Sequence, residues 1–90
     1  MRTLGRTGSF KRDYKREVRK AQWSGQAFMD VVSALAADSA LPEKFRDHAL
    51  TGQWKDHRDC HIRPDLVLIY RKLDNELQLV RIGSHSELGL

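Results

Sequence analysis

Apolar side chains recur three or four residues apart in the first part of the chain, which predicts amphipathic helices over residues 9–22 and 26–38. The apolar positions are Phe10, Tyr14, Val18 and Ala21 in the first helix, and Phe28, Val31, Val32, Leu35 and Ala36 in the second. Ser24 and Gly25 interrupt the pattern. Because the connection is short, we expect the two helices to form an antiparallel hairpin.

In the second half of the chain the apolar period changes to that of a strand. We expect three strands there, over residues 53–61, 65–72 and 76–82. The middle one is an unbroken apolar run, as in a central strand covered on both faces. A short strand over residues 2–6 is also expected, and residues 84–90 form a tail. The pattern predicts an α+β fold in which residues 1–90 form one domain, with the helical hairpin packed on an antiparallel sheet of three to four strands.

The composition is that of a folded globular protein, with 40% hydrophobic and 31% charged residues among 90. No apolar run approaches the roughly 20 residues that a membrane-spanning helix needs, and the first residues lack the apolar segment of a signal peptide. Cys60 is the only cysteine and cannot form an internal disulfide, which fits a reducing compartment. We therefore expect a cytoplasmic protein that does not bind membranes, with Cys60 in a structural role.

The positive charge is concentrated in the first predicted helix. Residues 1–22 contain eight Lys or Arg and two acidic residues, so they carry +6 and the remaining residues carry −2 of the net +4. Lys11, Lys15 and Arg19 lie on the face opposite the apolar positions. Such a stripe predicts a polyanionic partner or an acidic protein partner. The alternative is an ordinary solvated helix face.

Three of the four histidines fall within residues 48–65. The spacing of His57, His61 and Asp65 would place them on one face of a helix as metal ligands, but Pro64 and the strand pattern argue against a helix. On a strand, residues four apart are separated by about 13 Å, which is too far for two ligands of one zinc ion. We expect no metal and no cofactor, although ligands gathered from distant segments remain an alternative.

Acid–base chemistry is the other use for this cluster. Metal-free RNA cleavage needs a base for the ribose 2′-OH, an acid for the leaving 5′-oxygen, and cations near the phosphate. His48, His61 and His85 lie near strand ends that a meander gathers at one end of the sheet, so we expect the three rings to converge. Asp65 would orient a histidine or act as base. The further candidates are Lys55, Arg58 and Arg81 as cations and Trp54 as a base-stacking platform, with surface histidines and a core tryptophan as the alternatives.

Three linked motifs carry a resemblance to a known family. DHALTGQWK, RDCHIRPDLVLIY and RIGSH follow one another at the intervals found in the YafQ branch of the RelE/ParE toxin superfamily, and the basic helix with FKRDYKR extends the resemblance weakly to nearly the whole chain. The resemblance implies a RelE-like fold with a twisted antiparallel sheet. It also implies a metal-independent endoribonuclease that cuts mRNA at the ribosomal A site and is neutralised by a cognate antitoxin. The expected partners are thus the antitoxin, the ribosome and mRNA.

The resemblance also implies which residues act. His48, His61, Asp65 and His85 match the catalytic set, Asp59 matches a further acidic position, and Arg81 matches a basic one. Relatives commonly carry an aromatic residue after the last histidine, where this chain has SELGL, so Trp54 or another residue would have to stack on a base. Two other functions stay open: a ParE-like toxin that inhibits gyrase by protein contact, and an inactive relative that binds antitoxin or nucleic acid.

Overall fold

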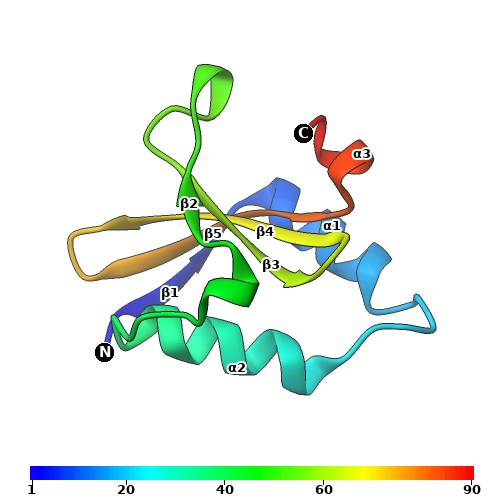
Figure 1. Cartoon of the computed structure of the whole chain (residues 1–90), viewed down its shortest axis with the longest axis horizontal. Coiled ribbons are helices and arrows are strands. Elements are labelled where there is room, and N and C mark those ends of the chain that lie inside the picture. Colours follow the sequence, from blue (N-terminus) through cyan, green and yellow to red (C-terminus); the bar gives the residue numbers. More distant parts are fainter.

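The computed structural model describes residues 1–90 (Figure 1). Its strands are β1 (Thr3–Arg6), β2 (His48–Ala49), β3 (Arg58–Arg63), β4 (Leu66–Leu73) and β5 (Glu76–Gly83). Its helices are α1 (Gly8–Glu17), α2 (Gly25–Ala36) and α3 (His85–Leu88), with single 3-10 turns at Glu43–Phe45 and Gly52–Trp54. The longest helix is far too short to cross a lipid bilayer. The predicted α+β class is confirmed.

The sheet has five strands in the order β1-β5-β4-β3-β2, so the expectation of three to four strands was wrong. The extra strand is β2, which pairs His48 with Asp59. The expected strand over residues 53–61 begins only at Arg58, because Asp56 has a φ of 69° that turns the chain before it. β1 is parallel to β5, whereas the other neighbours are antiparallel.

The first helix is shorter than its apolar pattern predicts. Thr7 begins it by accepting a hydrogen bond from the Phe10 N–H, but the helix ends at Glu17, not at residue 22. Val18 is 38% exposed, so the periodic apolar positions beyond the helix end do not belong to the core. The residues of α1 that are buried against the sheet are instead Phe10, Asp13 and Glu17. Two acidic side chains of α1, Asp13 and Glu17, are thus buried on successive turns of the helix.

Two hydrophobic clusters cover the two faces of the sheet. α1 and α2 cover one face; Phe28 of α2 stacks on Phe10 at 6.2 Å between ring centroids and joins the helices to each other. Val67, Ile69, Val80 and Leu88 form the second cluster on the other face. In Figure 1 α2 runs below the sheet and α3 lies above it. β4 contributes to both clusters, which confirms the prediction of a central strand.

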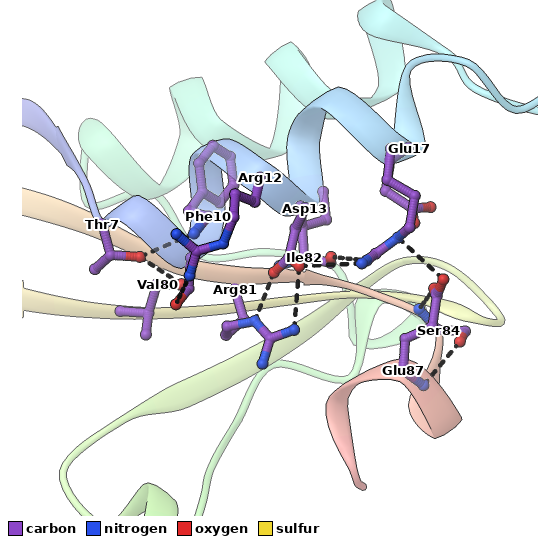
Figure 2. Close-up of polar contacts among 12 residues, drawn as sticks. Thr7, Phe10, Arg12, Asp13, Glu17, Val80, Arg81, Ile82, Ser84 and Glu87 are labelled. Carbon is purple, nitrogen blue, oxygen red and sulfur yellow. Dashed lines mark hydrogen bonds and ion pairs between the residues drawn. The ribbon is translucent and has the colours of Figure 1, made fainter.

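Side chains of α1 complete the edge of β5 where β1 ends (Figure 2). The Thr7 hydroxyl donates to the Val80 carbonyl at 2.7 Å. Asp13 accepts from the Ile82 N–H at 3.2 Å, and the Arg16 guanidinium donates to the Ile82 carbonyl at 3.0 Å. Main-chain groups that a sheet edge would leave unpaired are therefore satisfied by a helix.

Asp13→Ala is expected to lower the free energy of unfolding by about 2–4 kcal/mol, because it leaves the buried Ile82 N–H and Arg81 without their acceptor. The measurement is the urea midpoint. Asp30→Ala is the matched control, since Asp30 is exposed and accepts only from Gln26; it is expected to change stability by less than about 0.5 kcal/mol. Equal midpoints for the two variants would contradict the edge-capping role of Asp13.

Candidate active site

The structure brings three histidines from separate elements together. The ring centroids of His48 and His61 are 6.5 Å apart, and those of His61 and His85 are 4.9 Å apart. Strand register produces this arrangement: His48 lies on β2 opposite Asp59, and His61 on β3 lies opposite Val67 of β4. His85 follows β5 as the first residue of α3. The expected convergence is observed, whereas the chemical roles of the rings stay predictions.

His57, the fourth histidine, is not part of this cluster. Its ring packs edge-on against Trp54 at 5.5 Å, and its Nδ1 lies 3.0 Å from the Lys55 carbonyl oxygen. It belongs to the turn that precedes β3. No group of three or more His, Cys, Asp or Glu side chains in the structure has an arrangement suited to a metal ion.

The surroundings of His48 fix its tautomer. Nδ1 lies 2.6 Å from the Arg46 carbonyl oxygen and 3.1 Å from the Asp59 carboxylate. Both neighbours are acceptors, so Nδ1 carries a proton and the lone pair of neutral His48 is on Nε2. Asp59 is only 3% exposed and its Oδ1 accepts no hydrogen bond of good geometry. Burial raises the pKa of Asp59, while the three histidines oppose that rise.

His85 is held by Asp65 in the same way. The backbone N–H of His85 donates to Asp65 Oδ1 at 3.0 Å, and its Nδ1 lies 2.7 Å from the same oxygen. These two bonds, the backbone one first, lower the pKa of Asp65. A carboxylate with a lowered pKa is a weak base but a good partner for an imidazolium. Of the two roles expected for Asp65, the geometry therefore favours orienting His85.

His61 lies between the other two rings and has no hydrogen-bond partner that fixes a tautomer. Its pKa is lowered, chiefly by burial, with His85, Arg46 and His48 adding to the effect and Asp59 opposing it. His61 is therefore neutral at physiological pH, and one ring nitrogen is free to accept a proton.

Arg81 is partly buried, and its guanidinium is held by Asp13. It lies on β5 opposite Ile69 of β4, and Ile69 lies opposite Asp59 of β3. Arg81 and Asp59 are therefore on the same face of the sheet. Its Nε and Nη2 donate to Asp13 at 2.6 and 3.1 Å, which raises the pKa of Arg81. Because Asp13 uses two of its five donors, the others remain for a ligand anion (Figure 2).

The other predicted supporting residues lie outside the cluster. Arg58 donates to Asp47, and Asp47 also accepts from the Tyr70 hydroxyl. The Arg58 guanidinium is therefore held by an ion pair within the fold. Trp54 is partly buried against the second hydrophobic cluster, and its indole nitrogen is buried without a hydrogen-bond partner. The remaining predicted cations are all exposed: Lys55 lies before β3, and Lys11, Lys15 and Arg19 lie on and just after α1.

Sequence reasoning missed the ion-pair network that places α3. Arg16 donates to Glu17 at 3.0 Å and lies 3.0 Å from Glu87, while Lys20 contacts the same two carboxylates at 2.8 and 3.1 Å. Glu87 also accepts from the Ser84 N–H, which is the first cause of a pKa lowered to about 2. The S-x-x-E spacing of Ser84 and Glu87 was the available signal, since it is that of a capping box.

Gly83 allows this network to form next to His85. A Cβ at this position would lie 2.7 Å from Arg16 Nη2 and 3.1 Å from Glu87 Oε1. Arg16 could then not reach the edge of β5 in its present position. The glycine in the RIGSH motif is thus explained by close packing between α1 and the start of α3.

Comparison with known proteins identifies the family. The sequence profile described as "Bacterial toxin of type II toxin-antitoxin system, YafQ" matches residues 2–89. The chain belongs to this family. It is 41% identical over 70 residues to the putative toxin YafQ of Haemophilus influenzae, an alignment that covers 73% of this chain and 69% of that protein. It is also 46% identical over 48 residues to the mRNA interferase toxin YafQ of Escherichia coli K12, covering 53% and 52% of the two chains.

Solved structures of YafQ-like toxins have the same fold. A metal-bound toxin from Helicobacter pylori superimposes with a TM-score of 0.90 at 41% identity, covering 98% of this chain and 99% of that one. YafQ in the E. coli DinJ–YafQ complex superimposes with a TM-score of 0.84 at 31% identity, covering 98% of both chains. This YafQ-like chain thus matches them over nearly its whole length.

The titration of His61 tests the electrostatics of the cluster. By NMR, its ring is expected to titrate below the ordinary histidine value of about 6.5, and Asp59→Asn is expected to lower that pKa further. Between the folded pKa and about 6.5 the unfolded chain binds more protons, so the stability contributed by His61 falls as the pH is lowered through this window. Asp56→Asn, in the exposed turn before β3, is the control and leaves the titration unchanged. A His61 pKa above 6.5 would overturn this account.

Proposed function

We propose that this YafQ-family protein is a toxin that inhibits translation by cutting mRNA on the ribosome without a metal, in the cytoplasm. The observation that carries the proposal is the convergence of three imidazoles, 4.9 and 6.5 Å apart, from three different elements. Metal-free cleavage of a phosphodiester needs a proton acceptor and a proton donor on opposite sides of one phosphorus atom. The name of the E. coli relative, mRNA interferase toxin, supports the same activity.

The protonation states suggest which ring does what. His61 is neutral, so it is the base that removes the 2′-OH proton, with His48 Nε2 beside it as the second acceptor. The 2′-oxygen attacks the phosphorus and the bond to the 5′-oxygen breaks. His85, whose Nδ1 is paired with the Asp65 carboxylate, acts as the acid and protonates that oxygen. The products are a 2′,3′-cyclic phosphate and a free 5′-OH, while Arg81 stabilises charge on the non-bridging oxygens.

His85→Ala is expected to lower the rate of mRNA cleavage on ribosomes by about 10²–10⁴-fold and to remove growth inhibition, because the leaving oxygen loses its acid. His57→Ala is the matched control and retains the parent rate, since His57 lies outside the cluster. Cleavage by the His85 variant at the parent rate would refute the assignment.

Two further measurements address the alternative functions. Toxin stripped of transition metals by a chelator before the assay is expected to keep its activity, which matters because the H. pylori relative is metal-bound. Mapping of mRNA 5′ ends after induction is expected to give new cuts within codons. DNA breaks instead of such cuts would favour a ParE-like action on gyrase, and neither would favour an inactive relative.

We also propose that a cognate antitoxin binds over α1 and α2, supported by the DinJ–YafQ complex of the E. coli relative. An apolar groove of about 440 Å³ lies there, lined by Leu4, Arg6, Phe10, Lys11, Tyr14, Lys15, Phe28, Met29, Val32 and Leu79. Leu4 and Met29 are 44% and 48% exposed in the structure. An apolar floor with a basic rim matches an amphipathic acidic segment better than it matches RNA phosphates alone.

Changing Lys11 and Lys15 together to Glu is expected to weaken antitoxin binding at least tenfold, by calorimetry with the acidic protein encoded beside the toxin gene. The loss is expected to shrink at high salt because the rim charges are exposed. Arg12→Glu with Lys44→Glu changes the net charge equally outside the groove and is the control. Equal losses for the two pairs would reduce the effect to net charge, and a selective loss of ribosome binding would assign the stripe to RNA.

A further inference from the structure

A small polar pocket borders the histidine cluster on the side of His85. It has a volume of about 180 Å³ and lies between the segment after α1, the turn from β3 to β4, and the start of α3. Its lining includes Lys20, Gln22, Trp23, Arg63 and Asp65. Asp65 therefore belongs to both places, since one of its oxygens holds the His85 ring at 2.7 Å. A ligand that contacts the catalytic cluster can extend directly into this pocket.

The pocket has a rigid aromatic wall. Trp23 is only partly buried, and its ring is fixed by an edge-on contact with Tyr14 at 5.4 Å and by Phe28 at 5.5 Å. Because the indole is already held in place, it loses little conformational entropy when a second planar ring stacks on it. Trp54 does not line this pocket and packs instead on the second hydrophobic cluster.

The polar groups of the pocket suit a nucleotide. The exposed Arg63 guanidinium can bind a phosphate, and the exposed Gln22 amide supplies both a donor and an acceptor for a base edge. The carboxylate of Glu17 does not oppose this, because Lys20 at 2.8 Å and Arg16 at 3.0 Å neutralise it. The volume is below the roughly 300–1,000 Å³ of sites for drug-sized ligands, so it fits one base and not two.

We infer that this pocket binds the RNA base immediately 3′ of the cut, with Trp23 stacking on the base, Gln22 contacting its edge and Arg63 binding the phosphate on the 3′ side of that nucleotide. The inference rests on the proposed nuclease function for the direction of the strand. His85 protonates the 5′-oxygen of the leaving nucleotide, and the pocket is next to His85, so the leaving side of the substrate lies there. Base preference at this position is then set outside the histidine cluster.

Binding of the four nucleoside 3′-monophosphates, which carry the phosphate that the leaving nucleotide keeps, tests the pocket in the intact protein without any cleavage. By NMR, they are expected to shift the Trp23 indole N–H. Arg63→Gln, a surface change, is expected to weaken binding about 5- to 100-fold, as loss of one strong nucleotide contact does. Arg12→Gln is the matched control, with an exposed arginine on α1 that does not line the pocket. Shifts confined to the histidine rings, or no shifts, would overturn the inference.

Cut-site mapping on ribosomes separates this inference from the nuclease proposal. Arg63→Gln, Gln22→Ala and Trp23→Leu are expected to change the base preference 3′ of the cut and to raise KM with little change in kcat. If the parent cleaves and all variants keep its cut profile, the pocket assignment is wrong while the nuclease stands. If the parent binds nucleotides at Trp23 but does not cleave, the nuclease proposal fails and the pocket remains.

Discussion

The fold depends on how the exposed edge of β5 is completed. β1 is only four residues long and pairs with the first half of β5, so main-chain groups at Val80 and Ile82 would otherwise lack partners. Thr7, Asp13 and Arg16 supply these partners from α1. A helix can do this only with side chains that reach and bond the edge, which is why a buried aspartate faces the sheet. Because β5 leads into α3, the same contacts fix the position of His85.

The three histidines have different surroundings, which distinguish rings of the same chemistry. His48 and His85 each have Nδ1 beside a fixed acceptor, a carbonyl oxygen in one case and the Asp65 carboxylate in the other. His61 has neither, and burial keeps it neutral. The difference comes from main-chain geometry and from two carboxylates, Asp59 beside His48 and Asp65 beside His85.

α1 connects the two faces of the molecule. Its exposed lysines border the apolar groove beside β1, while Asp13 holds Arg81 on the sheet face that carries Asp59. Arg16 and Lys20 pair with Glu17 and Glu87, so the helix also fixes α3 and one wall of the polar pocket. The strongly basic composition of this segment therefore has two origins. Some cations are structural partners of buried carboxylates, and others are free for anionic ligands.

The sequence by itself determined the fold class, the second helix, the central strand and the segments that carry the histidines, because these depend on local periodicity. The three motifs also identified the family, because they follow one another at the intervals found in it, and the family match over residues 2–89 confirms this. Only the tertiary structure decided that α1 stops at Glu17, that β2 exists and that Trp54 packs on the second hydrophobic cluster. Each of these results from contacts between segments distant in the chain: ion pairs with α3, pairing of His48 with Asp59, and packing on β4 and β5. The different surroundings of the three histidines also depend on tertiary structure, because burial and hydrogen-bond partners are properties of the folded chain.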